Sequence, residues 1–199
     1  MIVPAGDYRY EIRRAGDLVA IEEARVLGDV LTATRRSAGG LNRHEVEAAL
    51  DAEGRVRHLS VRYSSTLFKR SAVYDAIEEN LRGSVSALAG RNEILVKLGR
   101  FREIEVADMT VFRMLTLAHV RERQQPRWTG RVAVIDGNTL VAASLKQNCW
   151  RREAAGDIWV YEPRMGDSEE IELDQEGRIL RRRDHRGVET TLAGFTPAG

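Results

Sequence analysis

The sequence predicts a mainly β protein in which one α-helix separates two runs of antiparallel strands. Polar and apolar residues alternate along most of the chain, short connectors carry glycine with aspartate or asparagine, and a single segment has a helical period. Alternation places every second side chain on one face, as in an antiparallel sheet with one solvated face. No linker or shift in composition divides the chain, so we expect one domain over residues 1–199.

The first alternating run lies at 6–14, where Tyr8, Tyr10 and Ile12 share one parity and charged residues take most of the other positions. The segment 71–83 fits a helix and a strand equally well, and Gly83 and the flanking strands favour a strand. Further alternating runs lie at residues 44–50, 57–63, 92–99, 131–136, 140–148, 157–161 and 169–173.

A five-residue phrase, Asp-x-Glu-Gly-Arg, occurs at 51–55 and again at 174–178, and 184–187 is a looser copy. Each copy follows one strand-like run and precedes another. Aspartate at the first position can accept hydrogen bonds from the turn backbone, and glycine at the fourth can adopt a positive φ. A calcium loop would need further oxygen ligands at alternate positions. The phrase therefore predicts hairpin turns at Asp51–Gly54 and Asp174–Gly177.

One segment, at about 108–123, has the period of a helix rather than of a strand. Its apolar residues recur three, four and seven positions apart, and we expect Asp108 to cap its start and Pro126 to follow its end. The apolar stripe consists of Val111, Met114, Leu115 and Ala118, with Phe112 beside it.

Composition excludes several classes of protein. The net charge is +1, so no overall field favours nucleic acid, and no apolar stretch is long enough for stable membrane insertion. The single cysteine, Cys149, allows no internal disulfide. The first residues lack the pattern of a signal peptide, so we expect a soluble, cytoplasmic protein.

The order of these elements resembles bacterial uncharacterised proteins built on the lipoprotein-carrier (LolA/LolB-like) half-barrel. The resemblance lies in the opening GDYRYEIRRAGDLV, the central ADMTVFRMLTLAHVR, and the closing DIWVYEP with EEIELDQEGRILRRRD. It implies a strongly curved antiparallel sheet, a central helix closing the concave side, and an apolar groove that holds acyl chains or similar ligands. We expect no export signal at the start of the chain, which would depart from that family's pattern.

Ligand-binding residues are expected where the helix and a strand would line such a groove. Phe112 and Leu115 lie on the helical stripe. In the run 140–148, Leu140, Ala142, Ser144 and Lys146 share one face that begins apolar and ends polar, as a pocket with a polar mouth requires. An ordinary strand running from core to solvent would show the same pattern. The leading hypothesis is a non-catalytic protein that binds a lipid-like or other hydrophobic small molecule.

Two other function classes stay open. In an enzyme, Lys146, His119 and the acidic cluster 167–170 would converge on a small substrate; in an interaction scaffold, a broad apolar patch would be exposed. No catalytic motif, phosphate loop or metal-ligand pattern is present, and we expect no cofactor and no metal. The arginines of 178–186 fit either an anion site or the protection of an edge strand, and the absence of interleaved aromatic residues favours protection.

Overall fold

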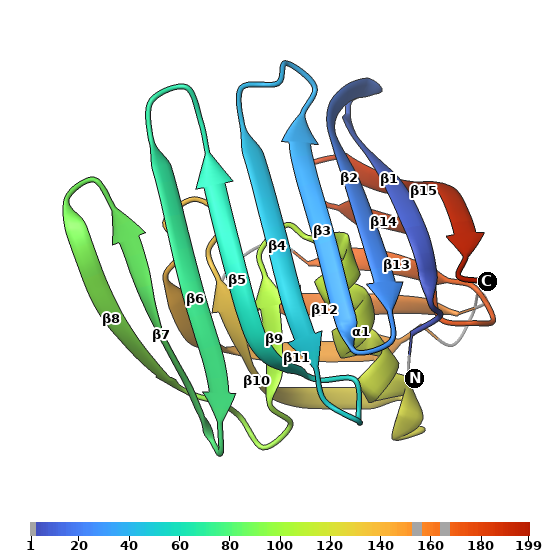
Figure 1. Ribbon diagram of the computed structural model, residues 1–199. Coiled ribbons are helices and arrows are strands. Elements are labelled where there is room, and N and C mark those ends of the chain that lie inside the picture. The colour runs from blue at the N-terminus through green and yellow to red at the C-terminus, as the bar shows by residue number, and fades with distance from the viewer. Residues whose placement is uncertain (1–2, 153–156, 164–167) are drawn as a thin grey trace.

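The computed structural model describes residues 3–152, 157–163 and 168–199. They form one 15-stranded sheet and one helix (Figure 1). The elements are β1 Gly6–Arg14, β2 Asp17–Leu27, β3 Val30–Ser37, β4 Arg43–Leu50, β5 Val56–Ser64, β6 Lys69–Ile77, β7 Asn80–Ala87, β8 Gly90–Lys97, β9 Glu103–Val106, α1 Thr110–Glu122, β10 Arg127–Ile135, β11 Ala142–Arg151, β12 Ile158–Pro163, β13 Glu169–Leu173, β14 Ile179–Asp184 and β15 Val188–Pro197.

The strands follow the order β8-β7-β6-β5-β4-β3-β2-β1-β15-β14-β13-β12-β11-β10-β9. The first eight strands are a continuous meander, and the last strand pairs with β1, so the two ends of the chain meet near the middle of the sheet. The pair β9–β10 is parallel. A parallel connection needs a long crossover, and α1 supplies it.

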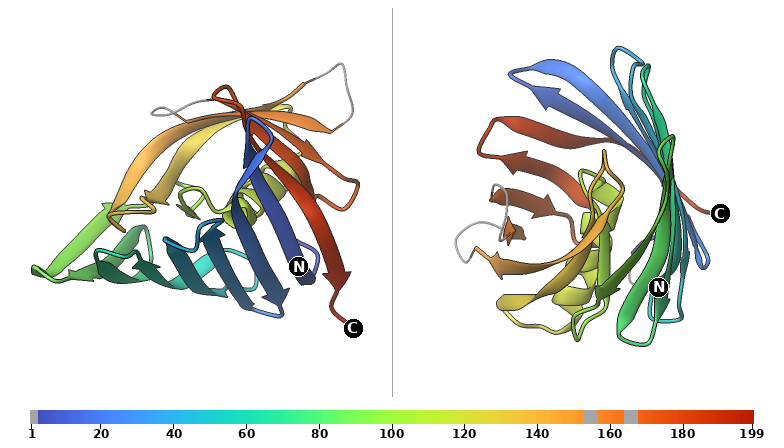
Figure 2. Two further views of the ribbon diagram at one scale, coloured as in Figure 1. Left: turned by 90° about the horizontal axis from the view of Figure 1, so that it is seen from above. Right: turned by 90° about the vertical axis from the view of Figure 1, so that its left-hand side faces the viewer.

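The sheet bends so that its two halves face one another with α1 between them (Figure 2). This arrangement confirms the predicted mainly β fold, a curved half-barrel-like sheet with one helix on its concave side. The helix is buried nearly all round, from Thr110 to Val120 except at Arg113, rather than along one stripe. A helix covered by sheet on opposite sides has no need of a polar face.

The start of α1 is held by a residue that the sequence did not predict. Asp108 is not the cap; Met109 occupies that position without a side-chain hydrogen bond. Instead, the backbone N–H groups of Thr110 and Val111 donate to the two carboxylate oxygens of Glu22, at 2.8 and 3.0 Å. Glu22 lies on β2 and is fully buried. The bend of the sheet brings β2 to the helix start, which no local pattern reveals.

The repeated phrase forms hairpin turns as predicted. Gly54 and Gly177 have φ values of 77° and 86°. Asp51 Oδ1 accepts the backbone N–H groups of Glu53 and Arg55, and Asp174 Oδ1 accepts the corresponding pair in the second copy. The ambiguous segment is strand, as predicted: it covers parts of β6 and β7, and Gly83 lies opposite Tyr74, whose ring occupies the space that a Cβ would need.

The interpretation of the arginine-rich segment as a protected edge is wrong. It forms β14, which lies between β13 and β15 in the interior of the sheet. Its arginines are paired with carboxylates of neighbouring strands: Arg181 with Glu189, and Arg182 with Glu169. Cross-strand charge pairs stabilise a sheet, so the segment is explained by its strand neighbours. No helix among the described residues is long and apolar enough to cross a membrane.

Candidate ligand-binding site

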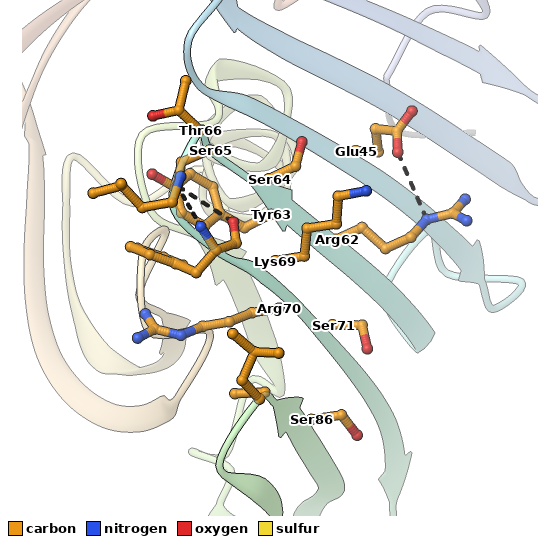
Figure 3. Close-up of a pocket in the computed structure, with 14 residues that line it drawn as sticks. Glu45, Arg62, Tyr63, Ser64, Ser65, Thr66, Lys69, Arg70, Ser71 and Ser86 are labelled. Atoms are coloured by element: carbon orange, nitrogen blue, oxygen red, sulfur yellow. Dashed lines mark hydrogen bonds and ion pairs between the residues drawn. The ribbon is translucent and has the colours of Figure 1, made fainter.

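A pocket of about 720 Å³ lies at the end of the β5–β6 hairpin, and we call it the rim pocket (Figure 3). Its size falls in the usual range for small-molecule sites. It combines a polar floor, apolar loop tips and several cations. Its lining residues are Glu45, Arg62, Tyr63, Ser64, Ser65, Thr66, Leu67, Phe68, Lys69, Arg70, Ser71, Ser86, Ala87 and Leu88.

The floor of the rim pocket is a row of polar side chains across four strands. Glu45 pairs with Arg62, Arg62 with Ser71, and Ser71 with Ser86 in the register of β4 to β7. Side chains directly opposite each other in an antiparallel sheet share a face. The adjacent residues Val61 and Ala72 point into the core. The polar row therefore lies on the outer face of the sheet.

Apolar side chains stand at the edge of this floor. Leu67 is 84% exposed and Leu88 is 90% exposed, at the tips of the β5–β6 and β7–β8 hairpins. Phe68, next to Leu67, is fixed by its ring contact with Tyr63 at 5.5 Å and by Ser65 Oγ, which accepts its backbone N–H. A rigid aromatic beside two exposed leucines gives an apolar ligand surface to contact.

Charge in the rim pocket is positive. Arg62, Lys69 and Arg70 against Glu45 leave a net charge of three minus one, or +2. Arg70 donates to the carbonyl of Asn138, and Arg62 lies 3.7 Å from Glu45. Lys69 makes no ion pair within the described part of the chain. Its ammonium group is therefore the cation that an incoming anion can reach without displacing a partner.

The six ligand residues predicted from sequence lie elsewhere. Phe112, Leu115, Leu140 and Ala142 are buried in the core, Ser144 is half-buried and Lys146 is exposed. The carbonyl of Leu140 accepts the hydroxyl of Tyr74, which fixes the loop before β11 against β6. None of the six lines the rim pocket. That they bind a ligand stays a prediction.

The groups of the enzyme alternative are not brought together by the described residues. His119 is buried, with Nδ1 3.0 Å from Glu103 Oε2 and Nε2 3.0 Å from the carbonyl of Glu53. Lys146 and its neighbour Gln147 point to opposite faces of β11, and Gln147 lies on the face shared with Glu169. Asp167, in the acidic cluster, lies outside the described residues.

A second cavity, of about 250 Å³, holds a cluster of buried charges beside α1. Arg113 lies 2.8 Å from Glu105 and 3.6 Å from Glu169, with its guanidinium over the ring of Tyr161. Burial raises the pKa of Glu105 and outweighs the attraction of Arg113. Burial would also raise the pKa of Glu169, but Arg182 and Arg113 outweigh it and lower that pKa.

This cluster has a structural rather than a catalytic role, because each of its charged side chains has a partner of opposite charge. The carbonyl oxygen of the Gln147 side chain lines the cavity and has no hydrogen-bond partner within the described residues, which suits an ordered water. Cys149 lies in the same region, and burial raises the pKa of its thiol to about 12. It is therefore a buried thiol and not a nucleophile.

Comparison with known proteins adds a likeness of fold. No protein-family model and no curated protein matches the chain. A solved structure of a DUF1089 family protein from Pseudomonas aeruginosa aligns with a TM-score of 0.62 and 16% identity, over 84% of this chain and 90% of that one. The two share a fold. At this identity the likeness carries no statement about ligand or activity.

The sequence missed the residues of the rim pocket. A signal was present in the stretch SSTLFKR at 64–70, where two large apolar residues sit among hydroxyls and cations in a hairpin loop. Loop residues of this kind are exposed, because turn backbones run over the surface. An apolar pair in such a loop is a better indicator of a binding surface than an apolar stripe, which the core accounts for.

Proposed function

We propose that the protein is a non-catalytic binding protein whose ligand is lipid-like, with an apolar chain and an anionic head group. The observation that carries this proposal is the rim pocket, where Leu67 and Leu88 are exposed beside Lys69, whose ammonium has no ion-pair partner among the described residues. Contact with a hydrocarbon chain would remove both leucines from water. An anionic head would gain a charge-assisted hydrogen bond from Lys69 and others from the hydroxyls of the floor.

Two further observations support this ligand class. The resemblance of the chain to lipoprotein-carrier half-barrels implies a hydrophobic ligand. The polar floor also explains why the site would select an amphipathic molecule over a purely apolar one, since an apolar molecule would leave the floor unpaired. A catalytic function has no comparable support, because Lys146, His119 and Glu169 lie in separate surroundings.

The test is calorimetric titration with a soluble fatty acid and with the fatty alcohol of the same chain length. Lys69→Glu should weaken binding of the fatty acid by about tenfold or more, the usual scale for one charge-assisted hydrogen bond. It should leave the affinity for the fatty alcohol unchanged. The double variant Leu67→Ser, Leu88→Ser should weaken binding of the acid and of the alcohol, because the two ligands have the same apolar chain.

Matched control variants lie at the opposite end of the sheet from the rim pocket. Arg57→Glu reverses an exposed charge beside Asp29, and Leu27→Ser removes an exposed leucine at the β2–β3 turn. Both should leave the two affinities unchanged. The proposal fails if neither ligand binds, or if Lys69→Glu weakens the acid and the alcohol equally.

A further inference from the structure

β8 is an edge strand with nothing paired to its outer side. It ends the sheet order, and no described strand is hydrogen-bonded to its outer side, although β11 contacts it (Figure 1). All eight of its residues are at least partly exposed, and Leu95 is 66% exposed. An unpaired edge of this length is a template for another strand. Proline, which blocks such pairing, is absent from Gly90–Lys97.

The register of β7 and β8 fixes which backbone groups are free. Leu98 donates its N–H to the carbonyl of Glu79, which makes this pair a hydrogen-bonded one. Hydrogen-bonded pairs recur at every second residue of an antiparallel ladder. The even-numbered residues of β8 therefore face β7, and the N–H and C=O groups of Glu93, Leu95 and Lys97 point to the open edge.

The side chains of β8 are complementary to a second copy of β8 in one antiparallel register. When Leu95 lies opposite the same residue of the second copy, Glu93 lies opposite Lys97 on both sides of the two-fold axis. On the inner face, Ile94 then lies opposite Val96. Opposite charges and matched apolar pairs across strands are stabilising, whereas like charges are not.

Two registers that slip toward the start of β8 are disfavoured by the same charges. A slip that places Ile94 opposite itself brings Arg91 opposite Lys97, and a further slip brings Glu93 opposite Glu93. Charges on an edge usually oppose association, but here the register centred on Leu95 places both Glu93 residues opposite Lys97. An isologous contact of this kind closes after two subunits.

We infer that the protein self-associates by antiparallel pairing of β8 with β8 of a second copy, in the register that places Leu95 on the two-fold axis. The contact joins two half-barrels into one continuous sheet. It uses the outer backbone groups of Glu93, Leu95 and Lys97, which no other part of the described chain uses. This inference stands apart from ligand binding, because none of these three residues lines the rim pocket.

The intramolecular partners of these charges offer little competition. Lys97 lies 3.8 Å from Glu79 and Glu93 lies 3.1 Å from Arg91, and all four side chains are exposed. Exposed ion pairs contribute little to stability. Exchanging them for the pairs across the two-fold axis therefore costs little.

Sedimentation equilibrium of charge variants tests the register. Glu93→Lys alone and Lys97→Glu alone each place like charges across the axis twice, and each should raise the dimer dissociation constant by roughly tenfold or more. An equimolar mixture of the two variants should form a heterodimer, because every pair then has opposite charges. Arg91→Glu is the matched control and should leave association unchanged, whereas the slipped register predicts tighter association.

A cysteine variant provides an independent readout. Cα atoms of a hydrogen-bonded pair lie about 5.5 Å apart, within the range that a disulfide spans. Leu95→Cys should therefore form a disulfide-linked dimer on mild oxidation, and Glu93→Cys should not, since it faces Lys97. Cys149 is buried and does not interfere. A protein that stays monomeric at its highest soluble concentration, or dimers unaffected by both charge variants, would overturn the inference.

Discussion

In three hairpins of this protein an aspartate holds the turn through its side chain. Asp51 and Asp174 each accept two backbone N–H groups, and Asp184 accepts that of Val188. The glycine that follows each takes a positive φ, which a β-branched residue resists. In the first two turns a glutamate lies between them, and the side chains of Glu53 and Glu176 are exposed. The aspartate and the glycine therefore carry the turn, and the glutamate does not.

Replacing Gly54 with valine should lower the free energy of unfolding by about 1–2 kcal/mol, the scale for a side chain forced into the left-handed region. Glu53→Gln should cost less than about 1 kcal/mol, because it removes only an exposed ion pair with Arg55. Urea denaturation of the two variants measures both. The reverse ranking, with stabilisation of the wild type by calcium, would mean that the turn is a metal loop.

His119 and His44 have pKa values shifted in opposite directions. Burial lowers the pKa of His119, but the hydrogen bond and charge of Glu103 outweigh burial and raise it above 6.5. Burial lowers the pKa of His44 and is only partly offset by its hydrogen bond with the Gly137 carbonyl. The stabilisation from His119 is present below 6.5 and is lost as pH rises through the folded pKa. That from His44 is present above 6.5 and is lost as pH falls.

These shifts predict separate effects of the two histidines on stability against pH. The difference in unfolding free energy between the wild type and His119→Gln should shrink as pH rises above 6.5. The difference for His44→Gln should instead shrink as pH falls below 6.5. Urea denaturation between roughly pH 5 and pH 9 tests both sides. If the unfolding free energy of all three proteins had the same dependence on pH, the contacts assigned to His119 and His44 would be contradicted.

At the scale of the element, α1 is positioned by residues far from it in sequence. Glu22 binds its first two N–H groups, and Glu103 binds His119 near its end. A carboxylate at a helix N-terminus also stabilises the helix dipole. The helix is thus fixed at both ends to the sheet that encloses it.

Glu22→Gln should lower the free energy of unfolding by about 1.5–3 kcal/mol, since an amide replaces a buried carboxylate that accepts two hydrogen bonds. Asp108→Asn is the matched variant beside the helix start. It should cost less than about 0.5 kcal/mol, because asparagine tolerates the left-handed φ of 66° and Asp108 caps nothing. If the two changes lowered the free energy of unfolding equally, Asp108 and not Glu22 alone would cap the helix.

The buried charges beside α1 should be costly to unbalance. Arg113→Met leaves Glu105 and Glu169 without their shared partner, and we expect a loss of about 3–5 kcal/mol. Arg152→Met, at the exposed pair with Glu170, should cost under about 1 kcal/mol. Adding Glu105→Gln to Arg113→Met should recover part of the loss. A purely additive double variant would show that the pair is not coupled.

At the scale of the molecule, the sheet has a protected middle and an exposed edge strand, β8. β1 is paired on both sides, with β2 and β15, whereas β8 is paired only with β7. Amide groups bonded within the interior of a sheet exchange through larger openings than those at an edge. Stability is therefore graded along the sheet from β1 to β8.

Hydrogen exchange followed by NMR should show alternation along β8. The N–H groups of Glu93, Leu95 and Lys97 should exchange rapidly in dilute solution, and those of Ile94 and Val96 slowly, because only the latter face β7. Raising the protein concentration should slow the first three selectively if β8 pairs with β8. Uniform exchange along the strand would contradict the register described above.

Features set by neighbours in sequence could be predicted from the sequence alone. Strand alternation, the glycine turns at 51–54 and 174–177, and the helix near 108–123 depend on backbone geometry within a few residues. For the candidate site, the sequence indicated a ligand class but placed it at residues such as Phe112 and Leu140, which are in the core. An apolar stripe cannot distinguish a groove lining from a packed interior.

Tertiary structure decided what depends on how the sheet bends and where it ends. Its curvature brings Glu22 to the start of α1 and covers the helix on opposite sides, so that its predicted cap and single apolar face are both replaced. Strand order places the arginines of β14 in the interior and leaves β8 at the edge. These outcomes arise from contacts between residues distant in the chain, whose register is fixed only when the whole sheet forms.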